Sequence, residues 1–113
     1  MNLQQIIDQL NLTVLTEPRD FAAIRTTGGY SSDLLSCVMA GAKKGFLWTT
    51  LQAHLNIVAV AALTEVAAVI ITENAQPDSA SVAKANEQGV ILLSTHQFTY
   101  EINGKLWELG IHN

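Results

Sequence analysis

The sequence predicts a small α/β domain, a layered structure in which a mostly parallel sheet is flanked by helices. Short apolar runs that suit buried strands alternate with segments whose apolar residues recur at helical spacing. This alternation is typical of a parallel sheet that is covered by helices and joined by right-handed crossovers. The length of 113 residues fits one domain, residues 1–113, with a core that needs no disulfide or structural metal.

The first quarter of the chain predicts one helix and little regular structure after it. Apolar residues recur at helical spacing within residues 3–10, Asn2 offers an N-cap, and Asn11 can end the helix. Residues 12–15 are β-branched and apolar enough for a brief strand. Residues 21–25 are expected to be a second extended piece that leads into two glycines.

The next segment predicts a glycine turn that leads into a capped helix. Gly28 and Gly29 release the backbone from its usual steric limits. The Ser-Ser-Asp cluster at positions 31–33 offers side-chain oxygens to the free amides of a helix whose apolar residues recur between positions 34 and 42. Gly45 can adopt the left-handed conformation that closes this helix.

Three strands are expected in the second half of the chain. Residues 46–51 are aromatic and β-branched, and residues 66–71 and 90–93 are apolar runs that suit strands buried on both faces. Between the first two strands, the apolar run 57–63 is rich in alanine. That composition favours a buried helix with Asn56 as its cap.

Two further helices are predicted after these strands. Asp78 or Ser79 caps the first of them, and Gly89 closes it. The last helix is expected to begin at Ser94 or Thr95. One apolar face of this helix comprises Phe98, Ile102, Leu106 and Leu109.

Two segments resemble the DRTGG domain family. The first runs from Thr26 to Ala40 and contains the glycine pair, and the second runs from Leu47 to Ala61. Together they extend the resemblance over nearly all of the chain after about Pro18. The Asp-Arg pair in the family's name is not intact, because Arg25 stands apart from the glycines and the nearest preceding aspartate is Asp20.

The resemblance implies a role in regulation. DRTGG domains are appended modules in regulatory inserts of certain pyrophosphatases and at the front of some phosphotransacetylases. They are similar in fold to the N-terminal domain of HPr kinase/phosphorylase. None of these settings gives the module a reaction of its own, and in the pyrophosphatases it contributes to subunit association. We therefore expect an α/β regulatory domain that forms dimers.

Composition argues against two classes of partner. Hydrophobic residues make up 49% of the chain and charged residues only 14%, and such an apolar surface favours a protein partner. With six Lys and Arg against ten Asp and Glu, the net charge of −4 provides no basic stripe for nucleic acid. The longest apolar run, residues 55–72, is interrupted by Thr64 and Glu65, so we expect no membrane segment.

The single cysteine, Cys37, cannot form an internal disulfide, and the N-terminus lacks the features of a signal peptide. Both observations favour the cytoplasm.

Candidate ligand-binding residues lie in the turns that follow the predicted strands, because open parallel sheets bind ligands outside the carboxyl ends of their strands. A small ligand there could be phosphorylated or a nucleotide. Helix capping explains the same residue types and is the favoured interpretation. The candidates are Gly28, Gly29, Ser31, Ser32, Gln52, His54, Asn56, Ser94 and Thr95.

No cofactor or metal site is predicted. Asp33 would repel a phosphate at the glycine turn, and no P-loop lysine is present. His54 and His96 lack an acidic or cysteine partner at ligand spacing.

The favoured function is a regulatory or ligand-sensing domain without catalytic activity that forms a homodimer. Aromatic residues are enriched at interface centres, so Tyr30, Tyr100 and Trp107 are the predicted interface residues. Two alternatives stay open. The chain could be a small enzyme that uses His54 and Asp33, or an accessory subunit of a separate kinase or oxidoreductase.

Overall fold

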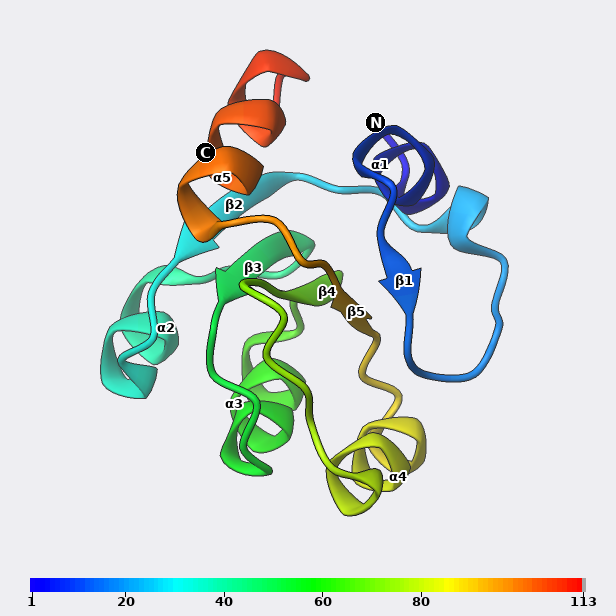
Figure 1. The fold of residues 1–113 in the computed structure, drawn as a ribbon, viewed down its shortest axis with the longest axis vertical. Helices are drawn as coiled ribbons and strands as arrows, with labels where there is room; N and C mark the ends of the chain where they lie inside the picture. The colour runs from blue at the N-terminus through cyan, green and yellow to red at the C-terminus, as the bar shows by residue number, and fades with distance from the viewer. Residues whose placement is uncertain (113) are drawn as a thin grey trace.

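The computed structural model describes residues 1–112 and shows a five-stranded sheet with helices on both faces (Figure 1). The strands are β1 (Thr13–Val14), β2 (Gly28–Ser31), β3 (Phe46–Thr50), β4 (Ala68–Ile71) and β5 (Leu92–Ser94). The α-helices are α1 (Leu3–Leu10), α2 (Leu35–Gly41), α3 (Asn56–Thr64), α4 (Ser79–Gln88) and α5 (Thr99–Glu108). A short 3-10 turn, η1 (Phe21–Ala23), lies between β1 and β2.

The strands lie in the order β1-β5-β4-β3-β2. Strands β2, β3, β4 and β5 run parallel to one another, and only β1 is antiparallel, to its neighbour β5. This mostly parallel, helix-covered sheet confirms the predicted α/β class.

Two cores lie on opposite faces of the sheet. Helices α1 and α5 and the turn η1 pack on one face, and α2, α3 and α4 pack on the other (Figure 1). Alternate residues of the central strands enter the two cores. The fully buried strand residues Leu47, Ala68, Ile70 and Leu93 belong to the first core, and Trp48, Val69, Ile71 and Leu92 belong to the second.

Local signals at helix ends are confirmed for α1 and α4. The Asn2 side chain accepts a hydrogen bond from the Gln5 amide at 2.9 Å, and the Gln5 side chain accepts one from the Asn2 amide at 3.0 Å. Asn11 ends α1 in the left-handed conformation. Asp78 caps α4 by accepting from a backbone amide, and Gly89 closes it at φ 73°.

The predicted extended piece at residues 21–25 and the glycine turn after it are wrong. Residues 21–23 form η1, because Phe21 turns into the core beneath α1. Gly28 and Gly29 form the first half of β2, paired with Phe46 and Leu47 of β3. The glycines therefore belong to a strand.

The predicted cap of α2 is also wrong in detail. Helix α2 begins at Leu35, and Leu34 occupies the N-cap position without a side-chain hydrogen bond. Ser32 instead accepts from the Leu34 amide at 3.1 Å, and Asp33 turns toward the end of β3. The prediction that Gly45 closes this helix is wrong, because α2 ends at Gly41 with Ala42 as an extended C-cap. Gly45 does adopt a left-handed conformation, at φ 84°, in the turn that leads into β3.

Helix α3 exists where it was predicted, but Asn56 is its first residue and not its cap. The expectation of a wholly buried helix is wrong on one side. Ile57, Val58, Val60 and Ala61 are buried, whereas Leu63 is 70% exposed.

The last helix starts later than predicted. Ser94 ends β5, and the Thr95 amide donates to the Ile71 carbonyl at 3.0 Å, so both residues continue the pairing with β4. Helix α5 begins at Thr99, after Phe98 in the N-cap position. Phe98 is 64% exposed, so the buried stripe of this helix consists of Ile102 and Leu106.

Candidate functional site

Polar side chains gather where the parallel strands end, and most of them bond to one another. Asp33, after β2, accepts hydrogen bonds from the Thr50 hydroxyl at 2.8 Å and from the Leu51 amide at 2.9 Å. The Gln52 side chain donates to the Asp33 carbonyl at 3.3 Å. These bonds tie the loop after β2 to the loop after β3.

A second group ties the loop after β4 to the start of α5. The hydroxyls of Thr72 and Thr99 lie 2.6 Å apart, and Thr99 also donates to the Glu73 carboxylate at 2.9 Å. The Thr72 hydroxyl, whose one hydrogen is shared with Thr99, lies 3.2 Å from the Thr50 carbonyl, and the Thr72 amide donates to that carbonyl at 2.9 Å. The polar residues at this edge thus satisfy each other and hold neighbouring loops together.

His54 lies near the N-terminus of α4. The backbone amide of Ser81 donates to Asp78 and lowers the pKa of that carboxyl group, and the charge of His54 lowers it further. Asp33 is instead bound to Thr50 and Leu51.

The predicted ligand-binding residues do not form one cluster. Ser32 and Gln52 both lie beside Asp33, and His54 and Asn56 are exposed at the start of α3. Ser94 and Thr95 are buried next to β4. Gly28 lies at the opposite, amino-terminal end of β2.

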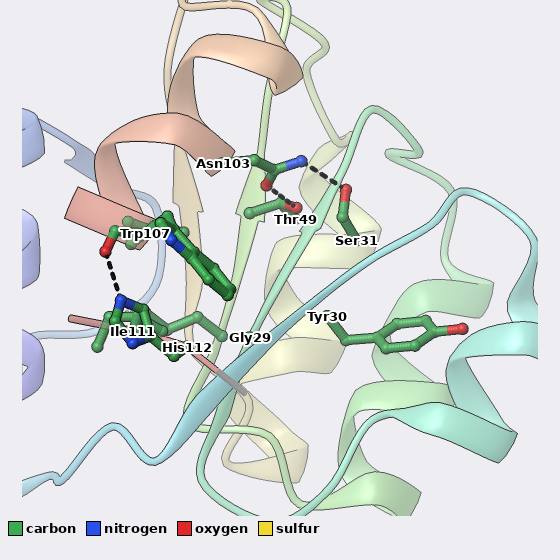
Figure 2. Close-up of a pocket in the computed structure, with 10 residues that line it drawn as sticks. Gly29, Tyr30, Ser31, Thr49, Asn103, Trp107, Ile111 and His112 are labelled. Atoms are coloured by element: carbon green, nitrogen blue, oxygen red, sulfur yellow. Dashed lines mark hydrogen bonds between the residues drawn. The ribbon is translucent and has the colours of Figure 1, made fainter. Parts of the chain in front are cut away.

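A pocket of about 150 Å³ lies between β2, β3 and the end of α5 (Figure 2). Two of the predicted ligand-binding residues, Gly29 and Ser31, line it. The other lining residues are Tyr30, Leu47, Thr49, Asn103, Leu106, Trp107, Ile111 and His112.

One wall of this pocket is polar. The Asn103 side chain donates to the Ser31 hydroxyl at 2.9 Å and accepts from the Thr49 hydroxyl at 2.7 Å (Figure 2). A hydroxyl can accept one hydrogen bond and donate another, and an amide nitrogen has two hydrogens. The Ser31 hydroxyl and the second Asn103 N–H therefore remain available to a bound group.

The adjoining wall is aromatic. The rings of Trp107 and His112 lie 4.3 Å apart, tilted by 32°. The Nε2 atom of His112 is 2.9 Å from the Trp107 carbonyl. Because a carbonyl only accepts, Nε2 carries the hydrogen, and Nδ1 is the free acceptor of the neutral ring.

Sequence reasoning missed this pocket. Asn103 is not among the candidate residues, and Thr49 lies within the strand predicted at residues 46–51. The available signal was the spacing of Asn103, Leu106 and Trp107, which places a polar, an apolar and an aromatic side chain on adjoining parts of one helix.

A different surface runs along the outside of α3. Leu55, Ala59 and Leu63 follow one another at four-residue spacing, and all three are exposed, Leu55 by 49% and Leu63 by 70%. We call these three residues the α3 stripe. They line a groove of about 440 Å³ whose other wall includes Lys84 and Gln88 of α4.

The predicted interface residues lie apart from this stripe, and Tyr30 lies apart from the other two. Tyr100 is 90% exposed and Trp107 62% exposed, both on α5. Tyr30 is half-buried and packs against the core of α2 and α3. Figure 2 shows Tyr30 and Trp107 on opposite sides of β2.

Within residues 1–112, no three His, Cys, Asp or Glu side chains are arranged to hold a metal ion. No helix in the same part of the chain has the length and apolar character needed to cross a membrane.

No family model and no curated protein matches the chain in sequence. In structure it is similar to the CBS and DRTGG domains of the regulatory region of Clostridium perfringens pyrophosphatase, crystallised with the activator diadenosine tetraphosphate. The two share 13% sequence identity with a TM-score of 0.71. The match covers 91% of this chain and 44% of the other, so the chain spans less than half of that regulatory region.

Proposed function

We propose, on the basis of its DRTGG-like fold, that this chain is a regulatory, ligand-sensing domain that self-associates and catalyses no reaction of its own. The matched pyrophosphatase region is regulatory and was crystallised with a nucleotide activator. Fold alone never specifies a site, so the proposal depends on the surfaces of this chain.

Self-association is supported above all by α3, which has no polar face. Its sequence from position 56 is Asn-Ile-Val-Ala-Val-Ala-Ala-Leu-Thr, apolar at every position between its two ends. A helix that is apolar all round is normally buried all round. Here the α3 stripe faces solvent, and Leu34, Met39 and Leu51 are exposed on the same helical layer or on the loops that lead into it.

A second copy of the chain is the partner that fits the α3 stripe. Two antiparallel α3 helices related by a two-fold axis would place Ala59 at the crossing point, where its small side chain permits close approach. Leu55 of each copy would then meet Leu63 of the other. Isologous pairing of this kind is the commonest form of oligomer.

The small ligand is assigned to the loops at the carboxyl ends of the strands, where Ser32, Gln52, His54 and Asn56 are accessible. Residues 32–34, 51–55, 72–78 and 95–98 include no Lys or Arg. A nucleotide would therefore present its base or ribose to these loops and leave its phosphates in solvent.

Thermal-shift measurements with adenosine, AMP, ATP and diadenosine tetraphosphate test this assignment, because His54→Ala or Asn56→Ala should reduce any shift.

A role without catalysis is supported by what Asp33 and His54 contact. A general base needs a free lone pair within hydrogen-bond reach of its substrate. The hydrogen bonds of the Asp33 side chain go to Thr50 and Leu51 and hold the loop after β3, whereas His54 lies near Asp78, so the described contacts do not pair the two groups that the enzyme alternative requires. An accessory role for a kinase or an oxidoreductase would appear as a co-purifying partner in a pull-down.

The exposed, unpaired Cys37 is consistent with the cytoplasm, where thiols stay reduced.

Light scattering across a dilution series tests self-association. The wild-type protein should have a dimer mass that falls toward the monomer mass on dilution. Leu63→Lys should be monomeric throughout, because it places a charge in the contact. Tyr100→Lys, a change at a more exposed position on α5, should keep the dimer. If Tyr100→Lys or Trp107→Lys dissociates the dimer while Leu63→Lys does not, the interface lies on α5, as the sequence predicted.

A further inference from the structure

The two edges of the sheet are protected to different degrees. Strand β1 is two residues long, and short edge strands are one means by which proteins avoid pairing with other chains. Strand β2, at the other edge, has four residues and contains no Lys or Pro. Within residues 1–112, its only paired strand is β3, so one side of β2 has no strand beside it.

The backbone of β2 directs hydrogen-bonding groups away from the sheet. The Ser32 amide donates to the Thr49 carbonyl of β3 at 3.3 Å. Because successive residues of a strand alternate in direction, the amides of Ser31 and Gly29 face the open side. An extended segment that lies along β2 can accept hydrogen bonds from both.

The pocket described above adjoins this edge. A residue on an added strand opposite Gly29 would point to the same face of the sheet as Gly29, which is the face that holds the pocket. Gly29 leaves space there, because a Cβ atom at this position would lie 3.6 Å from the Ile111 side chain, an ordinary contact.

The size of the pocket favours a single side chain. Its volume of about 150 Å³ is below the roughly 300–1,000 Å³ of pockets that hold drug-sized ligands. Leu106, Ile111 and the Trp107 ring provide apolar walls. A bulky apolar side chain fits these walls better than a charged one.

A second copy of β2 would not fill the pocket. On this face β2 presents only Gly29 and Ser31, so pairing between two β2 strands would place a glycine or a serine opposite the hollow. A segment of different sequence, with a large apolar residue at that position, is required.

Positive charges gather at one end of β2 and indicate which residues the nearby end of that segment carries. Arg25, Lys43 and Lys44 are exposed and precede β2 and β3, which run in parallel, so all three lie at the amino-terminal end of β2. They are half of the six Lys and Arg in the chain. Of these three side chains, only Lys44 forms an ion pair within the described residues, with the exposed Glu65 at 3.6 Å. Acidic residues near this end would be attracted.

We propose that β2 and the adjoining pocket form a docking site for an extended peptide segment of a partner protein. The segment adds a strand to the sheet, inserts a bulky apolar side chain beside Trp107, and carries acidic residues at the end near Arg25 and Lys43. Main-chain bonds supply affinity and the pocket supplies selectivity, as in other examples of strand addition. The site is separate from the α3 stripe and does not depend on self-association.

Fluorescence anisotropy with short labelled peptides tests the proposal. The probe has strand-forming residues, a central Phe and two Glu at one end. Replacing the central Phe by Ala should weaken binding about tenfold or more. Replacing both Glu by Lys should weaken binding at low salt. Only every second amide of the bound peptide faces β2. N-methylation of that set of amides should abolish binding, and N-methylation of the other set should not.

Variants of the protein provide the matched controls. Gly29→Val fills the pocket at an unstrained strand position, and Trp107→Ala removes one wall, so both should weaken binding of the Phe peptide about tenfold. Tyr100→Ala removes an exposed aromatic residue from the same helix outside the pocket and should change nothing.

Three outcomes would overturn the proposal. The first is equal binding of the Phe and Ala peptides, or binding that Gly29→Val leaves unchanged. The second is binding of adenosine or indole that Gly29→Val abolishes, with no binding of any peptide, which would identify a small-molecule pocket. The third is loss of the wild-type dimer in Gly29→Val, which would mean that β2 pairs with a second copy.

Discussion

Helices α1 and α3 are nearly equal in length but differ in how completely the fold covers them. Helix α1 buries Leu3, Ile6, Ile7 and Leu10 and presents polar residues such as Gln4 and Asp8 to solvent. Helix α3 buries one side in the same way, yet its other side is the exposed α3 stripe. The domain therefore buries the whole apolar side of α1, whereas α3 keeps exposed apolar surface that a further contact can cover.

The largest effect is expected from changes in the buried side of α1. Ile6 is fully buried in the core between α1, α5 and the sheet. Ile6→Ala should reduce the free energy of unfolding by about 2–5 kcal/mol, because it leaves a cavity. Urea denaturation followed by circular dichroism measures this loss. A change below about 1 kcal/mol would mean that the α1 core is loosely packed.

A smaller effect is expected at the N-terminus of the same helix. Asn2→Ala removes the reciprocal hydrogen bonds between Asn2 and Gln5. This change should cost about 1 kcal/mol of unfolding free energy, the usual value for an N-cap. The matched control is Asn56→Ala, since Asn56 is the first residue of α3 and does not cap it. If both variants lose the same stability in urea denaturation, Asn56 contributes a cap that the structure does not show.

The α3 stripe should respond differently from α1. Leu63 is 70% exposed, so Leu63→Ala should change the unfolding free energy of the dilute monomer by no more than about 0.5 kcal/mol. At higher concentration the wild-type protein should gain stability from association and the variant should gain less. Denaturation at two protein concentrations measures the difference. Equal concentration dependence in both proteins would exclude Leu63 from the contact.

The smallest effect is expected for Asp78 and depends on pH. The Ser81 amide and the charge of His54 lower the pKa of Asp78 below its ordinary value of 3.8. Its contribution to stability is therefore complete above pH 3.8 and is lost as the pH falls through the lowered pKa. Asp78→Asn should be slightly less stable than wild type at pH 7, and the difference should shrink in strong acid. A melting-temperature difference that grows below pH 3.8 would contradict this assignment.

Residues whose signals were local were predictable from the sequence. Asn2, Asn11, Asp78 and Gly89 mark helix ends because each acts through its own backbone neighbourhood. The buried strands β3 and β4 were predictable for a related reason, since residues enclosed on both faces form continuous apolar runs.

Residues whose roles depend on distant partners were not predictable. Gly29 suggested a turn, but its environment is set by Leu47 and Ile111, far along the chain. Asp33 suggested a helix cap, but the end of β3 offers it two donors, from Thr50 and Leu51.

The pocket beside β2 was hidden for the same reason. The polar wall joins Ser31, Thr49 and Asn103, which lie on three different elements. Their sequence separation leaves no periodic pattern from which a shared site could be inferred. The sequence therefore supplied Ser31 and Gly29 as candidates, and the spacing of Asn103, Leu106 and Trp107 on one helix did not show which strands face them.

Disulfide trapping through Ala59 tests most directly whether a second copy covers the α3 stripe. Ala59 is exposed at the centre of the stripe, and the only native cysteine, Cys37, can be replaced by Ser. In the Cys37→Ser background, Ala59→Cys should form a covalent dimer under mild oxidation, because two-fold pairing brings the two positions together. Tyr100→Cys in the same background should remain monomeric. A dimer trapped through Tyr100→Cys and not through Ala59→Cys would contradict the account.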